Sequence, residues 1–204
     1  LAEICPGDLN KAFFTLCGAT SIENAIKLAR LYTGRHKILS RYQSYHGASI
    51  GAISASGDPR RIAVDTQQAP NFIHFDLPYL YRWEYGEENM LKESVAQLER
   101  MIAYEAPGNI AAILLEGESG SSGCLQYPKG YLKAVREICD KHGILLIMDE
   151  VMSGFGRTGK WFGFQNHDIV PDMICMAKGL TCGYLPFGCL MVSDKIAAKY
   201  DDNV

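Results

Sequence analysis

The chain has 204 residues, 48% of them hydrophobic and 21% charged, and its formal net charge is −3 at pH 7. This length suffices for one domain with a substantial core, and the composition is ordinary for a globular protein. The small negative charge gives no reason to expect nucleic acid or an anionic membrane as a partner, and no apolar run approaches the ~20 residues that span a bilayer.

The first third of the chain predicts a strand at residues 11–16, followed by a tight turn around Gly18 and a helix at 21–32. Apolar residues recur at helical spacing in this helix, and Thr20-x-x-Glu23 matches a capping box at its start. A strand–glycine–helix junction offers free N–H groups and the positive end of a helix dipole, which favours an anion. Further strands are expected at 36–41 and 72–75, a helix at 48–55, and a loop at 57–71.

The rest of the chain continues the alternation of strands and helices. Apolar runs predict strands at 110–115, 144–149, 173–176 and 189–192, and helical periodicity predicts helices at 87–104, 129–142 and 194–200. Glu116 follows the first of these strands and precedes a loop rich in Gly and Ser. Strands that alternate with helices indicate a three-layer α/β/α sandwich with a mostly parallel sheet.

Seven cysteines are scattered along the chain without a C-x-x-C pair. Several fall in apolar periodic segments. We interpret them as reduced, mostly buried thiols of a cytoplasmic protein, and expect neither a disulfide framework nor a zinc or other metal site.

The most informative stretch runs from residue 144 to Lys178. Asp149 stands at the carboxyl end of one apolar run, and Lys178 follows a second run, 173–176, in a segment that suggests a partly desolvated amine. Because ligands of open α/β sheets bind beyond the carboxyl ends of the strands, both side chains are expected to face one crevice. A carboxylate beside such an amine suits pyridoxal phosphate (PLP): the lysine forms a Schiff base with its aldehyde, and the acid keeps the pyridine nitrogen protonated.

Two nucleotide-binding patterns compete for the same segment. Gly154-x4-Gly159-Lys160 fits most of a Walker A motif, but Trp161 stands where Ser or Thr must bind magnesium. Gly154-x-Gly156-x-x-Gly159 matches a dinucleotide fingerprint, but no helical pattern follows it. A strand-end acid and a solvated lysine without any function are the bland alternative, and for isolated residues that alternative would prevail.

Two long motifs change this balance. Residues 147–159 (IMDEVMSGFGRTG) and 172–179 (DMICMAKG) resemble the signature of class III aminotransferases, which are PLP enzymes of fold type I. The resemblance extends from about Phe13 to Val192. The segments 22–30 and 177–186 are most similar to the taurine–pyruvate group.

The resemblance implies a set of cofactor-binding residues. Gly18, Ala19 and Thr20 would hold the PLP phosphate; the usual family pattern is Gly-Ser, so Ala19 lacks one side-chain hydroxyl and backbone amides must contribute more. Tyr45 would stack on the pyridinium ring, while the role of His46 is left open.

The resemblance also implies the reacting groups. Lys178 would hold the cofactor and move the proton, Asp149 would keep the ring nitrogen cationic, and Val151 would pack on the ring face opposite Tyr45. Glu116 would line the substrate pocket and pair with an arginine from a C-terminal region outside this chain.

The function implied is transfer of a terminal amine, such as that of taurine or β-alanine, to a 2-oxo acid such as pyruvate. Another PLP reaction on the same fold (aminomutase, racemase, decarboxylase) and a non-catalytic, truncated PLP-binding domain stay open as alternatives. We expect residues 1–204 to form the PLP-binding large domain, with an N-terminal segment and a C-terminal small domain absent. The full-length protein is expected to be a homodimer, and these 204 residues alone to be inactive or feebly active.

Overall fold

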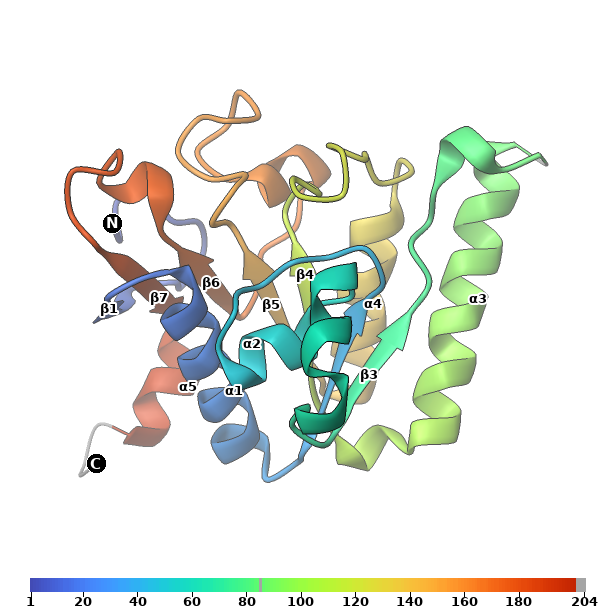
Figure 1. Cartoon of the computed structure of the whole chain (residues 1–204), viewed down its shortest axis with the longest axis horizontal. Coiled ribbons are helices and arrows are strands. Elements are labelled where there is room, and N and C mark those ends of the chain that lie inside the picture. Colours follow the sequence, from blue (N-terminus) through green and yellow to red (C-terminus); the bar gives the residue numbers. More distant parts are fainter. Residues whose placement is uncertain (85, 201–204) are drawn as a thin grey trace.

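The computed structural model describes residues 1–84 and 86–200. Its centre is a seven-stranded sheet with the order β1-β7-β6-β5-β4-β2-β3 (Figure 1). Strands β2 to β6 pair in parallel, whereas β7 runs antiparallel to both of its neighbours. The strands are β1 (Lys11–Thr15), β2 (Lys37–Arg41), β3 (Phe72–Phe75), β4 (Ile110–Glu116), β5 (Leu145–Asp149), β6 (Met173–Met176) and β7 (Gly188–Val192).

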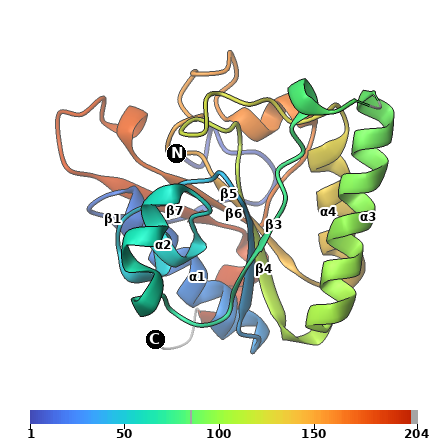
Figure 2. The same cartoon turned by 45° about the vertical axis from the view of Figure 1, so that its right-hand side comes forward.

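Helices cover both faces of this sheet. Helices α1, α2 and α5 lie on one face, and α3 and α4 pack together on the other (Figure 2). The three-layer α/β/α sandwich with a mostly parallel sheet is therefore confirmed. The helices are α1 (Gly18–Thr33), α2 (Ile50–Ala55), α3 (Glu87–Glu105), α4 (Tyr131–His142) and α5 (Asp194–Ala197); short 3-10 helices span Pro59–Gln67, Leu80–Arg82, Pro107–Asn109, Gly163–His167, Lys178–Leu180 and Ala198–Tyr200.

Strand β4 shows why the apolar runs of this chain are continuous. Side chains alternate between the two faces of a strand, so Ala112 and Leu114 pack in the core beneath α1 while Ile113 and Leu115 pack in the core beneath α4. All seven residues of β4 are buried. A parallel strand covered by helices on both faces has no polar face, and this removes the alternating pattern of a half-exposed strand.

The predicted capping box at the start of the first helix is wrong. Helix α1 begins at Gly18, and the N-cap is Cys17, whose extended backbone (φ −167°, ψ 175°) turns the chain into the helix. The hydroxyl of Thr20 accepts a hydrogen bond from the Cys17 N–H at 3.1 Å. Glu23 instead accepts hydrogen bonds from the N–H groups of Gly51 and Ala52 at the start of α2. The apolar stripe of the helix is buried as expected.

Two other expectations also need correction. Residues 57–71 are not merely a loop, because Asp58 caps a 3-10 helix at Pro59–Gln67 with Pro59 in its first turn. The cysteines are not mostly buried: three are buried, one is half-buried and three are exposed, although all seven are free thiols. Within residues 1–84 and 86–200, no helix combines the length and the hydropathy needed to cross a membrane.

Candidate active site

A cavity of about 670 Å³ opens where β4, β5 and β6 end and α1 begins. Such a volume is typical of a small-molecule site, and the carboxyl edge of a parallel sheet is where α/β proteins bind ligands. Seven of the eight residues proposed from the sequence line this cavity, and only Thr20 does not. These seven are Gly18, Ala19, Tyr45, Glu116, Asp149, Val151 and Lys178.

Three buried acidic residues stand at this edge of the sheet. Glu116 ends β4 and pairs in register with Asp149, which ends β5, and Glu150 follows directly. The three side chains are buried, with residue exposures of 0 to 4%. Buried carboxylates are costly unless each has a partner for its charge or its lone pairs, and each of these three has a different one.

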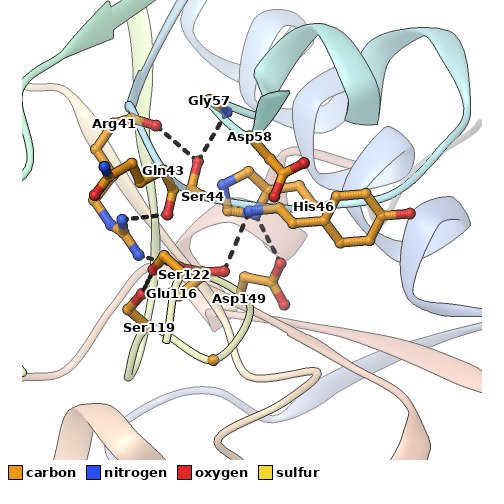
Figure 3. Close-up of polar contacts among 12 residues, drawn as sticks. Arg41, Gln43, Ser44, His46, Gly57, Asp58, Glu116, Ser119, Ser122 and Asp149 are labelled. Carbon is orange, nitrogen blue, oxygen red and sulfur yellow. Dashed lines mark hydrogen bonds and ion pairs between the residues drawn. The ribbon is translucent and has the colours of Figure 1, made fainter. Parts of the chain in front are cut away.

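The partner of Glu116 is Arg41, whose side chain is fully buried at the end of β2 (Figure 3). Its Nη2 donates to Glu116 Oε2, its Nε donates to the Tyr127 hydroxyl at 3.0 Å, and its Nη1 donates to the carbonyl of Gln43 at 2.7 Å. Burial raises the pKa of Glu116, and the adjacent guanidinium opposes that rise. Within the described residues, the arginine that pairs with Glu116 comes from β2, and the expected arginine of a C-terminal region lies outside this chain.

The partner of Asp149 is His46 (Figure 3). His46 Nδ1 lies 2.7 Å from Asp149 Oδ2, and the N–H of Val151 donates to Asp149 Oδ1 at 3.0 Å. The Nε2 atom of His46 is buried without a hydrogen-bond partner among the described residues. Asp149 is thus oriented by two hydrogen bonds, one on each oxygen, while it lines the cavity.

Glu150 points away from the cavity into the loop that follows β5. It accepts hydrogen bonds from the N–H groups of Gly163 and Phe164 and from the Ser153 hydroxyl, at 2.7 to 3.0 Å. Burial raises its pKa to about 7. A Cβ atom at Gly117 would overlap Glu150 Oε1, which explains why a glycine follows Glu116 in this chain.

The amino end of α1 forms one wall of the cavity. The first N–H groups of a helix have no partner within it, and those of Gly18 and Ala19 belong to residues that line the cavity. A Cβ atom at Gly18 would lie 2.9 Å from Val151 Cγ2, and one at Gly47 would lie 2.6 Å from the Cβ of Ala19. Gly18 and Gly47 thus allow the amino end of α1 to approach both the segment that contains Gly47 and the segment that follows β5. Thr20 faces Cys17, to whose carbonyl it donates at 2.9 Å, so its hydroxyl is engaged outside the cavity.

Lys178 follows β6 at the rim of the cavity. Its backbone is in the left-handed region (φ 44°) and its side chain is exposed. The expectation of a partly desolvated amine is therefore wrong for this chain. Gly179 packs against Phe155, where an added Cβ would lie 2.9 Å from Phe155 Cβ, so the turn after Lys178 rests on the loop that follows β5.

Tyr45 is half-buried and its N–H donates to Glu116 Oε1 at 3.3 Å. The guanidinium carbon of Arg60 lies 3.7 Å from the centre of its ring, and Arg60 also lines the cavity. Sequence reasoning left His46 open and missed Arg41 and Arg60. For Arg60 no local pattern pointed to the site, because it reaches Tyr45 from a segment expected to be a loop.

The nucleotide-binding alternatives find no support in the local structure. The N–H of Gly154 bonds to the carbonyl of Glu150, so the glycine-rich segment turns directly after β5. The N–H of Phe155 bonds to the carbonyl of Trp161 at 2.6 Å, which closes the segment into a loop. Only a short 3-10 helix, Gly163–His167, follows this loop, and it offers no long helix N-terminus for a phosphate.

The geometry fits PLP. A helix N-terminus suits a phosphate, a buried carboxylate with two hydrogen bonds suits a protonated ring nitrogen, and a lysine at the rim can reach an aldehyde. His46 keeps the acid oriented, and the apolar side chain of Val151 lies between the acid and the helix end.

Comparisons with known proteins agree with this geometry. The family model described as aminotransferase class III matches residues 1–202. The taurine–pyruvate aminotransferase of Bilophila wadsworthia is 38% identical over 94% of this chain and 43% of its own length, and the acetylornithine aminotransferase of Methanopyrus kandleri is 38% identical over 98% and 46%.

Among solved structures, the taurine:2-oxoglutarate aminotransferase of Bifidobacterium kashiwanohense, in complex with PLP and glutamate, superposes with a TM-score of 0.96 at 47% identity. The match covers 100% of this chain and 47% of that one. The chain thus spans about half the length of the relatives that it matches. On the family match and on these identities together, the chain belongs to the class III aminotransferases.

Proposed function

We propose that this chain is the cofactor-binding large domain of a PLP-dependent aminotransferase. The observation that supports this most strongly is the convergence of three groups on one cavity. These are Asp149 with its His46 partner, the amine of Lys178, and the amino end of α1 at Gly18. We assign residues 1–204 to this domain; residue 85 and residues 201–204 lie outside the described part of the chain.

In the proposed site, the N–H groups of Gly18 and Ala19 bind the phosphate of PLP. Asp149 holds a proton on the ring nitrogen, and the ring then serves as the electron sink that PLP supplies in such reactions. Tyr45 and Val151 cover the ring and exclude water from it. Thr20 is less suited to the phosphate than the sequence suggested, because its hydroxyl already bonds to Cys17.

Lys178 has two roles in this proposal. Its amine would hold the cofactor through the aldehyde, and when free it would accept the proton of the substrate carbon and return it to the cofactor side. Its exposure in the isolated chain leaves the amine accessible for both roles. Glu116 helps to shape the substrate side of the cavity, with its charge balanced by Arg41.

The proposed substrates are a terminal amine such as that of taurine or β-alanine and a 2-oxo acid such as pyruvate. Two of the relatives described above act, by name, on taurine, with pyruvate or 2-oxoglutarate as the acceptor. We further propose that the full-length protein is a cytoplasmic homodimer. The seven free thiols are consistent with a reducing compartment.

The cofactor assignment is tested by adding PLP to the full-length protein. The expected result is a visible absorption band, and borohydride reduction followed by peptide mapping should locate the label on Lys178. Lys160 is the matched control, because it is also exposed but lies in the glycine-rich loop outside the cavity. Labelling of Lys160, or no band in a folded sample, would contradict the proposal.

The substrate assignment is tested separately with a panel of donors. Taurine and β-alanine should react faster than ornithine, 4-aminobutyrate and α-amino acids, with pyruvate and 2-oxoglutarate compared as acceptors. A strong preference for an α-amino donor other than alanine would overturn the substrate and leave the cofactor assignment standing.

A further inference from the structure

Arg60 makes the shortest cation–ring contact described in residues 1–84 and 86–200. Its guanidinium carbon lies 3.7 Å from the centre of the Tyr45 ring, well inside the ~6 Å over which a cation and an aromatic face attract each other. Both residues line the cavity that contains Asp149 and Lys178. One face of the Tyr45 ring is thus occupied by Arg60, and only the opposite face is available to a planar ligand.

Arg60 is held in a fixed orientation although its side chain is 55% exposed. The carboxylate of Asp58 accepts from Arg60 Nε at 2.7 Å and from Nη2 at 3.0 Å, and it also accepts from the Arg60 N–H at 2.9 Å. Asp58 itself is the N-cap of the 3-10 helix Pro59–Gln67. A two-point contact between carboxylate and guanidinium fixes the plane of the guanidinium, which a single hydrogen bond does not do.

The backbone of Tyr45 is also held in place, by hydrogen bonds of Tyr45 and of its neighbour. Its N–H donates to Glu116 Oε1 at 3.3 Å, and the next residue, His46, is bonded to Asp149. These hydrogen bonds therefore fix the position of the Tyr45 Cα atom. The contact with Arg60 limits how far the ring can rotate away from the cavity.

From these contacts we infer that Arg60 is a positioning residue, which supports the Tyr45 ring from behind and keeps its free face toward the cofactor. This inference rests on the proposed function, because it assigns the ring of PLP to the free face of Tyr45. Arg60 does not touch the cofactor or the reacting atoms in this arrangement, and its effect passes through Tyr45.

The negative charge of Asp58 has a second role in this arrangement. A bare guanidinium behind Tyr45 would repel the protonated pyridine nitrogen that Asp149 is proposed to hold. The paired carboxylate of Asp58 balances that charge while it leaves the planar guanidinium in contact with the ring. Replacement of Asp58 by asparagine should therefore weaken the cofactor site in the same direction as loss of Arg60.

The neighbouring residue supplies a matched control. Arg61 is also an arginine of the same 3-10 helix, but it pairs with Asp65 at 3.4 Å and its guanidinium lies 5.7 Å from the ring centre of Tyr42. Tyr42 does not line the cavity. Loss of Arg61 removes the same charge and a similar length of side chain without touching Tyr45.

The test measures the dissociation constant of PLP for the full-length protein by absorbance titration. Arg60→Gln should weaken binding about two- to fivefold, as expected for an exposed cation–ring contact. Arg60→Lys should recover part of that loss, and Arg61→Gln should have no effect. In a Tyr45→Leu background Arg60→Gln should change nothing further. Thermal unfolding of the cofactor-free variants checks that the fold is retained.

Four outcomes would overturn the inference. An equal loss with and without Tyr45 would show that Arg60 does not act through the ring. An unchanged PLP dissociation constant with a raised KM for anionic substrates would show that Arg60 binds substrate directly. Failure of the unaltered protein to bind PLP would overturn both this inference and the proposed function, whereas normal binding by every variant would overturn this inference alone.

Discussion

His46 and Asp149 form a buried pair, 2.7 Å apart between Nδ1 and Oδ2, although they are 103 positions apart in the sequence. With the carboxylate ionised, the hydrogen bond requires that His46 Nδ1 carries a proton, because an ionised carboxylate can only accept. Asp149 ends β5 and Lys178 follows the neighbouring strand β6, and both residues line one cavity with His46. The acid is therefore held in place before any ligand arrives.

Asp149→Ala should leave PLP bound through Lys178 and the amino end of α1 but slow proton abstraction about 10²–10³-fold. Removal of one preorganised stabilising group typically costs about 3–4 kcal/mol in the transition state. Stopped-flow measurement of the half-reaction with the amino donor, in the full-length enzyme, checks this. Near-normal rates in the variant would show that the acid has another role.

His46→Ala should slow the same half-reaction by about ten- to a hundredfold, less than the loss of Asp149. A hydrogen bond to a charged group is worth about 1.5–3 kcal/mol, and here it orients the acid without bearing the charge. The decisive measurement is the double variant. If His46 acts only through Asp149, adding His46→Ala to Asp149→Ala should change the rate little.

Arg41→Met should destabilise the folded protein by about 3–5 kcal/mol, because it leaves the carboxylate of Glu116 buried without its partner. Adding Glu116→Gln should recover a large part of this loss, since the uncompensated charge is then removed as well. Urea unfolding of the two single variants and the double variant measures the coupling. Additive losses would mean that the two side chains do not stabilise each other.

Gly47→Ala should destabilise the protein by about 2–4 kcal/mol and weaken PLP binding. Its φ of +140° is unfavourable for alanine, and the new Cβ would lie 2.6 Å from the Cβ of Ala19 at the amino end of α1. Gly34→Ala is the matched control, because φ is also positive (+69°) but no atom lies within 4 Å of the added Cβ. The control should cost about 1 kcal/mol and leave PLP affinity unchanged.

Glu150 should make folding less favourable as pH rises from 4.5 to 7. Burial raises its pKa from 4.5 to about 7, so the folded protein keeps the proton after the unfolded chain has released it. Stability is unaffected by this group below pH 4.5, falls through the window by up to about 3 kcal/mol, and is constant again above it.

Urea unfolding at several pH values checks the contribution of Glu150. The Glu150→Gln variant should lack this part of the pH dependence, whereas Glu88→Gln, which removes one exposed charge, should keep it. Parallel profiles for the unaltered protein and Glu150→Gln would contradict the raised pKa.

Most of the architecture could be predicted from the sequence, because it follows from local patterns. Strand β4 is a continuous apolar run and α4 has a clear apolar stripe with Gly143 as its left-handed cap, so type and position were accessible. The exact ends of the helices depended on which of several possible hydrogen-bond partners capped them. Thr20 fitted a capping box with Glu23, but the chain already turns at Cys17, and Glu23 is then used to hold the amino end of α2.

The candidate site was predictable only in part. Motif spacing pointed to Asp149 and Lys178, and the structure brings both to one cavity. The partners of the buried acids were not predictable, because arginine is seldom fully buried and Arg41 meets Glu116 across 75 positions. Arg60 was missed for a related reason, since its contact with Tyr45 depends on a cap at Asp58 that composition did not reveal.

The pairing of β1 with β7 has a consequence for the order of events during synthesis. Lys11 lies opposite Val192, so the strand that leads into α1 has no neighbour in the sheet until the chain has been made almost to the end of the described region. Contacts between such distant segments form late and slowly, because the long intervening loop must first be closed. A nascent chain on the ribosome therefore carries Cys17 and Gly18 beside an unpaired β1 until Val192 has been added. The wall of the cofactor cavity at the amino end of α1 is therefore completed only after β7 has been made, and β1 stays without a sheet partner until then.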